Sequence, residues 1–143
     1  MKLSQLLNQK GRKTLTVDPN DTLSTVFSVL SKNKIGALVV CNEKEEVAGI
    51  ISERDLVKAV AKDGERILAW PVQSCMTTDV ITCTEEDTVD DVMSKMTAGR
   101  FRHVPVVKDE KLCGVISIGD VVKNRMEEVE REAADMRAYI HAV

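Results

Sequence analysis

Apolar residues follow the same helical spacing in two separate stretches of the chain. The first stretch contains Leu23, Val26, Phe27 and Leu30, and the second contains Val89, Val92, Met93 and Met96. The spacing i, i+3, i+4, i+7 places apolar side chains on one face of a helix. Polar turn and helix-start signals precede both stretches, at residues 18–21 and 84–87. The pattern therefore predicts two amphipathic helices at equivalent positions of a repeat.

Strand-like apolar runs surround each predicted helix in the same order. One short run precedes the helix, at residues 14–17 and 80–83, and two follow it, at residues 35–41 and 47–51 and again at residues 101–107 and 112–116. The segment Gly-Ile-Ile-Ser-Glu-Arg-Asp starts at Gly49, and its counterpart Gly-Val-Ile-Ser-Ile-Gly-Asp starts at Gly114, 65 residues later (114 − 49 = 65). Each copy predicts a buried strand, a Ser-x-x-Asp turn and the start of a helix.

The order of these elements predicts an α/β fold made of two tandem β-α-β-β-α repeats. We assign the repeats to residues 10–67 and 75–132, and residues 65–78, which contain Trp70-Pro71, are predicted to be a linker. A repeat of about 55–60 residues buries too little surface to be comfortably stable alone. The two repeats are therefore expected to pack together as one module around an approximate two-fold axis.

Both ends of the chain are predicted to be helical. Residues 1–10 indicate a short helix or arm with Leu3, Leu6 and Leu7 on one face. The tail, from Val121 onward, has apolar residues at alternating steps of four and three, which is a heptad seam. The seam consists of Val122, Met126, Val129, Ala133, Met136 and Ile140. Two interpretations stay open: the seam docks on the chain's own surface, or it lies in a homodimer interface.

The composition favours a globular protein and argues against a membrane protein or a nucleic-acid-binding protein. The chain has 143 residues, of which 43% are hydrophobic and 30% charged, values that are typical of a soluble globular protein. A net charge of −3 argues against a general nucleic-acid or anionic-membrane surface. No apolar run approaches the ~20 residues of a spanning helix, and no signal-peptide core follows the N-terminus, so a cytoplasmic protein with neither a membrane nor a nucleic acid as partner is expected. Of the four cysteines, only Cys75, in the predicted linker, is a candidate for redox sensitivity.

The Ser-x-x-Asp turns have a structural and a functional explanation. Ser52-x-x-Asp55 and Ser117-x-x-Asp120 each fit a capping box, in which the serine caps the backbone N–H groups at the start of a helix. An ionised aspartate also offers only acceptors, so it can take both hydroxyl donors of a ribose cis-diol. The adjacent helix N-terminus supplies N–H groups suited to a phosphate. Two copies in one repeat frame favour the functional explanation.

Four motifs in order carry a resemblance to a known family. They are Gly49–Asp55, Met76–Thr82, Arg102–Val107 and Gly114–Asp120. Together they resemble a tandem cystathionine-β-synthase (CBS) domain pair, the Bateman module, of the short stand-alone type. The resemblance implies clefts between the repeats that bind adenosyl ligands such as AMP, ADP, ATP, NAD or S-adenosylmethionine. It also implies disc-shaped dimers and a regulatory role.

In the geometry that the resemblance implies, each cleft takes its aspartate from one repeat and much of its other wall from the partner repeat. The first cleft would combine Ser52, Arg54 and Asp55 with Ile81, Thr82, Arg102 and His103. The second would combine Ser117 and Asp120 with Thr14, Thr16, Gly36 and Ala37. The first cleft is expected to have a cationic phosphate end, because arginine suits bidentate phosphate contact. The second has fewer cations, chiefly Lys13 at its rim, and is expected to bind phosphate more weakly.

We interpret the chain as a regulatory module that binds an adenine nucleotide, most simply AMP, ATP or NAD, and passes that state to a partner protein yet to be identified. No catalytic residue, catalytic cofactor or metal site is expected, because the sequence has no phosphate-loop, dinucleotide or metalloprotease motif and no metal-ligand spacing. Two other classes stay open, namely an enzyme that acts on the bound nucleotide and a purely structural dimerisation module. A homodimer is expected.

Overall fold

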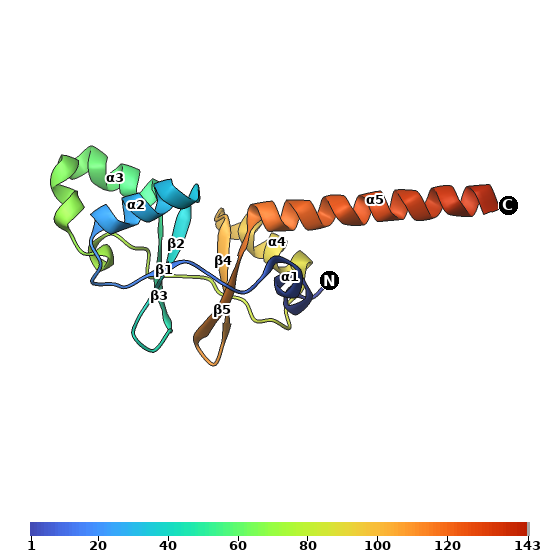
Figure 1. Cartoon of the computed structure of the whole chain (residues 1–143), viewed down its shortest axis with the longest axis horizontal. Helices are drawn as coiled ribbons and strands as arrows, with labels where there is room; N and C mark the ends of the chain where they lie inside the picture. Colours follow the sequence, from blue (N-terminus) through green and yellow to red (C-terminus); the bar gives the residue numbers. More distant parts are fainter. Residues whose placement is uncertain (143) are drawn as a thin grey trace.

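The computed structural model describes residues 1–142 and consists of two α/β halves, with one long helix projecting from the second half (Figure 1). The first half contains β1 (Thr16–Val17), α2 (Leu23–Asn33), β2 (Ala37–Cys41), β3 (Val47–Ser52) and α3 (Glu53–Asp63). The second half contains α4 (Val89–Gly99), β4 (His103–Lys108), β5 (Lys111–Ser117) and α5 (Ile118–Ala142). The predicted α/β fold of two tandem repeats with a C-terminal helix is confirmed.

The two sheets differ by one strand. In the first half β1 pairs in parallel with β2, which pairs antiparallel with β3, whereas the second sheet contains only the antiparallel pair β4 and β5. The expected strand at residues 80–83 is wrong, because only Cys83 forms a bridge, to Val106. The N–H of Val80 donates to the carbonyl of Thr78 at 3.0 Å, so the run begins in a local turn and not in a ladder.

Each half has its own apolar core beneath its helices. The i, i+3, i+4, i+7 residues supply much of each core, and Val26 and Val92 are fully buried at equivalent positions. The predicted N-terminal helix is α1 (Leu3–Lys10), and its three leucines pack into the core of the second half rather than the first. The N-terminal helix that precedes the first repeat therefore packs into the core of the second half.

The predicted linker is an ordered part of the first half. It contains two 3-10 helices, η1 (Gly64–Ala69) and η2 (Val72–Ser74), and both Ile67 and Val72 are fully buried in the first core. The interpretation of residues 65–78 as a simple connection is therefore wrong. Trp70-Pro71 disrupts regular helix, but the apolar residues on either side still bury their side chains.

Backbone hydrogen bonds show that the segments preceding β1 and α4, which we call the lead-in segments, cross over between the two halves. The N–H of Val72 donates to the carbonyl of Asp21 at 2.8 Å, which holds the lead-in of the second repeat against the first half. The N–H of Leu3 donates to the carbonyl of Asp87, also at 2.8 Å, which holds the lead-in of the first repeat against the second half. Asp21 and Asp87 are equivalent positions, so the exchange is reciprocal and ties the halves together.

Helix α5 extends well beyond the second half (Figure 1). Its contacts with the rest of the chain lie in its first turns, where Val121 and Asn124 are buried and Asp120 and Arg125 form ion pairs with Lys10 and Asp90. The seam residues Val122 and Ile140 are 50% and 62% exposed, so docking of the seam on the chain's own surface is wrong. Among residues 1–142, no helix has the length and apolar character needed to cross a membrane.

Candidate functional site

The first Ser-x-x-Asp turn forms where β3 passes into α3. The carboxylate Oδ2 of Asp55 accepts hydrogen bonds from the backbone N–H and the hydroxyl of Ser52, at 2.9 and 3.0 Å. In return, the Ser52 hydroxyl oxygen accepts from the N–H of Asp55 at 3.4 Å. The turn is therefore a capping box, as the structural explanation predicted. Capping engages Oδ2 alone and leaves Oδ1 for another partner.

The second turn has the same geometry where β5 passes into α5. Asp120 Oδ2 accepts from the N–H and the hydroxyl of Ser117 at 2.8 and 2.9 Å, and the Ser117 hydroxyl oxygen accepts from the N–H of Asp120 at 3.2 Å. Each turn is also tied to the neighbouring strand, because Glu53 N–H donates to Gly36 O and Ile118 N–H donates to Arg102 O. Gly36 and Arg102 thus occupy equivalent positions beside the two aspartates.

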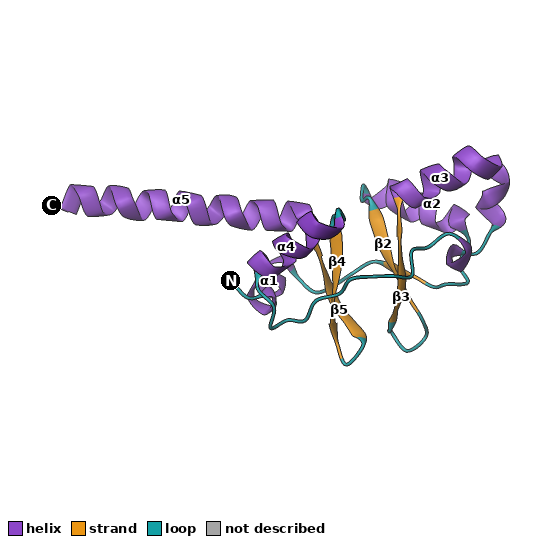
Figure 2. Cartoon of the chain, turned by 180° about the vertical axis from the view of Figure 1, so that it is seen from behind, coloured by secondary structure: helices purple, strands orange, loops and turns teal. Residues whose placement is uncertain are grey.

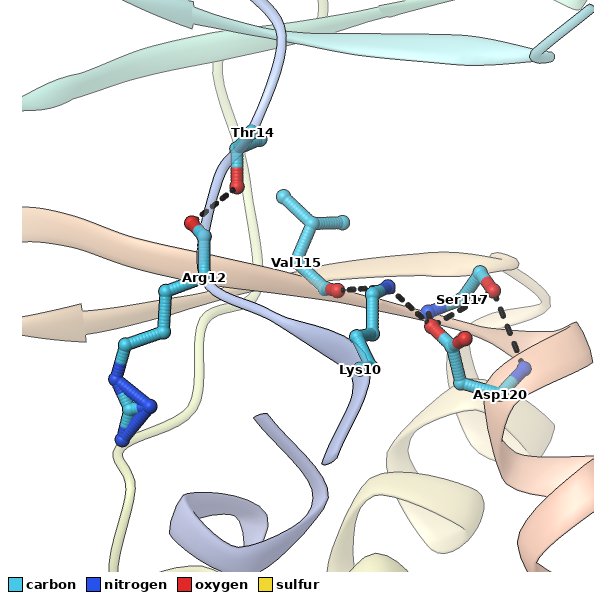
Figure 3. Close-up of polar contacts among 6 residues, drawn as sticks. All are labelled: Lys10, Arg12, Thr14, Val115, Ser117 and Asp120. Atoms are coloured by element: carbon cyan, nitrogen blue, oxygen red, sulfur yellow. Dashed lines mark hydrogen bonds and ion pairs between the residues drawn. The ribbon is translucent and has the colours of Figure 1, made fainter. Parts of the chain in front are cut away.

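A residue of the lead-in segment contacts each aspartate. Thr77 bridges Ile50 through the backbone, and its hydroxyl donates to Asp55 Oδ1 at 3.3 Å. On the other side, Lys10 Nζ donates to the carbonyl of Val115 at 2.6 Å and to Asp120 Oδ2 at 2.5 Å (Figure 3). We call these places the Asp55 site and the Asp120 site. They are related by the repeat, but a hydroxyl lies against one aspartate and an ammonium against the other.

Lys10 changes the electrostatics of the Asp120 site. Partial burial alone would raise the pKa of Asp120, but hydrogen bonds from Lys10 and Ser117 outweigh it and hold the pKa below its usual value. The Asp120 carboxylate is therefore ionised at neutral pH. In Figure 3 the ammonium lies against the carboxylate oxygen that the capping box also uses.

His103 lies within electrostatic reach of both turns. It pairs with Ser117 across the β4–β5 ladder, which places it beside the Asp120 site. Burial lowers the pKa of His103, and the positive charges of Lys10 and Arg102 lower it further, while the carboxylates of Asp120 and Glu53 oppose them. The net lowering keeps the imidazole neutral at pH 7. The expected cationic wall therefore depends on Arg102, with His103 as a hydrogen-bonding group.

The other predicted site residues form no hydrogen bond with the side chain of either aspartate among residues 1–142. Gly36 and Ala37 lie beside the Asp55 turn, although the sequence assigned them to the second cleft. Ala37 pairs with Ser52 across the β2–β3 ladder, and Thr16 pairs with Val39. The Thr14 hydroxyl donates to Arg12 O, and the Thr82 carbonyl accepts from Lys95. The side chains of Arg54, Ile81 and Arg102 are exposed. None of these predicted site residues is fully buried.

Sequence reasoning missed the two residues that contact the aspartates, Thr77 and Lys10. Thr77 belongs to the quoted motif Met76–Thr82 but was not singled out. Lys10 lies at the end of α1, where a terminal lysine fits the helix dipole and gives no signal of a distant contact. Only the crossing of the lead-in segments, which has no sequence motif, brings Lys10 to Asp120.

A large apolar groove, which neither aspartate lines, runs along α2 and α3. This α2–α3 groove has a volume of about 780 Å³, and its lining includes Phe27, Leu30, Leu56, Val57 and Val60. Val57 is 66% exposed, which is unusual for an apolar residue in the middle of a helix. Residues 1–142 contain no cluster of three or more side chains suited to a metal ion.

Comparison with known proteins identifies one family. The family model for the CBS domain matches residues 11–62 and 72–127. A mitochondrial CBS domain-containing protein of Arabidopsis thaliana is 34% identical over 146 residues, which cover 96% of this chain and 71% of that protein.

Solved structures agree with the family match. The crystal structure of a CBS-domain containing protein from Agrobacterium tumefaciens has a TM-score of 0.81 and 47% identity, covering 87% of this chain and 92% of that chain. The CBS domain pair of protein MJ0100, crystallised with 5′-methylthioadenosine and S-adenosyl-L-methionine, has a TM-score of 0.79 and 26% identity, covering 90% of this chain and 98% of that chain.

Proposed function

The chain belongs to the CBS-domain family, and on that premise we propose that it is a regulatory module that binds an adenosyl ligand at the Asp55 and Asp120 sites. AMP, ADP, ATP, NAD and S-adenosylmethionine are the candidate ligands. The ligand state would be passed to a regulated partner protein. We keep residues 10–67 and 75–132 as the proposed repeat boundaries, and a cytoplasmic location as a prediction.

The observation that carries this proposal is the pair of equivalent aspartates beside helix N-termini. Each carboxylate is fixed by its serine through Oδ2, so Oδ1 can accept from a ribose hydroxyl. The hydrogen bonds of residues 1–142 include none from the backbone N–H of Arg54 or Gly119, in the first turns of α3 and α5. Free N–H groups at a helix N-terminus favour a phosphate or another anion. The adenosyl compounds in the MJ0100 structure support this class of ligand.

The two sites are proposed to differ in preference. The Asp55 site would bind a phosphorylated ligand, with ribose on Asp55 and Ser52, the base near Ile81 and Thr82, and phosphate near Arg54 and Arg102. The backbone of Arg102 is bonded to the Asp120 turn, so this proposal requires its exposed side chain to reach across to the Asp55 site. His103 lies within electrostatic range of Glu53, which supports its place on the far wall of this site. The Asp120 site would accept a less highly charged ligand, because its ammonium is already paired with Asp120. Thr14, Thr16, Gly36 and Ala37 are proposed as its far wall, which requires the ligand to extend from Asp120 to the first half, where Gly36 and Ala37 lie beside the Asp55 turn.

Calorimetry with AMP and adenosine tests the Asp55 site. Asp55→Ala should weaken AMP binding about tenfold or more, because it removes charge-assisted hydrogen bonds worth roughly 1.5–3 kcal/mol. Asp91→Ala is a matched control, since Asp91 forms a capping box with Thr88 in α4 and lies at neither site. Arg102→Ala should weaken AMP more than adenosine. Unchanged AMP affinity in Asp55→Ala would leave the turn as a helix cap only.

Analysis of the bound ligand distinguishes the sensor from an enzyme and from a purely structural module. Native mass spectrometry of the purified protein would show a co-purified nucleotide if the module is a sensor. Turnover of that nucleotide would favour an enzyme that acts on its ligand. Empty sites that no nucleotide stabilises would favour a purely structural dimerisation module. The exposed α2–α3 groove supports a homodimer in either case, because an apolar surface of this kind is normally covered.

A further inference from the structure

Most of helix α5 projects away from the other elements (Figure 2), and its apolar seam is exposed among residues 1–142. The seam contains Val122, Met126, Val129, Ala133, Met136 and Ile140. Every residue from Val129 to Ala142 is exposed, so tertiary packing contributes nothing to this part of the helix. An isolated helix of such length is marginal in water, and most helices depend on the burial of an apolar face. The seam therefore needs a partner surface.

We propose that the seam pairs with the same seam of a second copy as a parallel, two-stranded coiled coil. The proposal rests on the homodimer of the proposed function and adds the segment and the direction of pairing. The heptad positions follow from the steps of four and three: Met126, Ala133 and Ile140 are at a, and Val122, Val129 and Met136 are at d.

The charges beside the seam fit a parallel pair. In a parallel coiled coil, a residue at g faces the residue at e of the other helix that is five positions further along. Arg125 would face Glu130 of the second copy, and Glu132 would face Arg137 of the second copy. Both pairs are attractive, and the two-fold symmetry makes each of them twice.

The same charges oppose an antiparallel pair. The antiparallel register with the greatest overlap sets Val122 opposite Ile140 of the second copy. It would then place Glu130 against Glu130 and Glu132 against Glu132, which are like charges. It would also place Lys123 against Arg137. Like charges across a coiled-coil seam destabilise the pairing, so the charge pattern selects the parallel direction.

The part of the chain before α5, residues 1–117, is called the body here. Its position leaves room for the α5 helix of the second copy. Val121 and Asn124 face the body, and at 3.6 residues per turn they lie about 100° and about 160° round the helix from Val122 of the seam. The body therefore lies beside the pair and not between the two helices. Arg125 already bonds to Asp90 and Glu128 within the chain. For this reason the pair between Glu132 and Arg137 is the sharper test.

Disulfide trapping of the full-length protein tests the direction. In a Cys75→Ser/Cys113→Ser background, Ile140→Cys should give a covalent dimer under mild oxidation, since equal a positions meet in a parallel coil. Ala138→Cys is the matched control, because Ala138 is on the outer f position and should give little product. A mixture of Val122→Cys and Ile140→Cys proteins that cross-links more strongly with each other than Ile140→Cys does alone would overturn the parallel arrangement.

Exchanging the charges of Glu132 and Arg137 tests whether this pair stabilises the parallel coiled coil. Glu132→Arg should raise the dimer dissociation constant roughly three- to tenfold at low salt, because it turns two attractive pairs into two repulsive ones. Adding Arg137→Glu should restore the wild-type value. A dimer with no Ile140→Cys cross-link would overturn the coiled coil while leaving the homodimer in place. A monomer mass by light scattering across micromolar concentrations would overturn both.

Discussion

Lys10 is the residue that makes the two aspartate sites chemically different. Its ammonium contacts Asp120 Oδ2, whereas Asp55 is contacted by the neutral hydroxyl of Thr77. A ribose on Oδ1 of Asp120 would therefore bind a carboxylate whose charge an ammonium on Oδ2 already partly neutralises, which weakens it as an acceptor. Asp55 has no ammonium partner, so the repeat symmetry of the fold does not extend to its ligand chemistry.

We predict that Lys10→Met raises the affinity of the Asp120 site for adenosine. The substitution keeps an unbranched apolar stem and removes the ammonium that neutralises the carboxylate, which should strengthen adenosine binding by about threefold to tenfold for a partly exposed ion pair. Calorimetry with Asp55→Ala protein isolates the Asp120 site. Lys10→Arg should stay close to wild type. Weaker adenosine binding in Lys10→Met would show that the ammonium assists the ligand.

A pH dependence follows from His103. The folded protein holds the pKa of His103 below the value of about 6.5 for an ordinary histidine. As the pH falls through about 6.5, the unfolded chain takes up a proton that the folded chain does not, so the folded state loses stability. Urea unfolding should therefore show wild-type stability decreasing from about pH 7.5 to 5.5. His103→Gln should remove most of that slope; an equal slope in both proteins would contradict this assignment.

At the scale of elements, the predictable features are those with a local pattern. The apolar spacing of Leu23 to Leu30 and of Val89 to Met96 was sufficient to place α2 and α4, because burial of one face decides whether a helix forms. Residues 80–83 look equally strand-like, yet only Cys83 bridges a neighbour. Strand pairing depends on a distant partner, which a short run does not specify.

At the two aspartate sites, too, the local motifs could be predicted from the sequence and the long-range contacts could not. Ser52-x-x-Asp55 and Ser117-x-x-Asp120 were recognisable, since a capping box is local in sequence. Lys10 was not, because it is 110 residues from Asp120 and depends on how the lead-in segments cross. The burial of Ile67 and Val72 was missed for a related reason, as their core partners lie in α2 and α3.

Close contact between a lead-in segment and a strand predicts different effects at two equivalent glycines. A Cβ on Gly49 would lie 2.7 Å from the backbone oxygen of Thr77, whereas one on Gly114 would lie 2.7 Å from a terminal methyl group of Leu7. Backbone yields less readily than a side-chain end, so Gly49→Ala should cost about 1–3 kcal/mol of unfolding free energy and Gly114→Ala less. Chemical denaturation of both variants measures this, and a larger loss in Gly114→Ala would contradict it.

Gly49→Ala should also impair ligand binding, because the displaced Thr77 supports Asp55. The two effects can be separated by measuring AMP affinity at a temperature where the variant is fully folded. Gly114→Ala, with Lys10 still able to reach Asp120, should bind AMP as the wild type does. Equal losses of affinity would mean that the contact between Thr77 and Asp55 does not matter for the ligand.

At the scale of the whole molecule, the body and the projecting helix have different sources of stability. The body buries two cores that the crossed lead-in segments join, whereas α5 beyond Glu128 buries no side chain within the chain. Stability that comes from association depends on protein concentration, and stability that comes from an internal core does not. Heating experiments at several concentrations can therefore assign each part to its source.

We predict that removal of residues 129–143 leaves the body folded and lowers the concentration dependence of its unfolding temperature. The full chain should unfold at higher temperature as its concentration rises, because dimerisation stabilises only the folded state. The truncated chain keeps Arg125, Asp90 and Glu128, so the base of α5 retains its ion pairs. It should retain AMP affinity at the Asp55 site and show a smaller rise in unfolding temperature over the same range. Identical concentration dependence in the two proteins would place the dimer interface in the α2–α3 groove instead of α5.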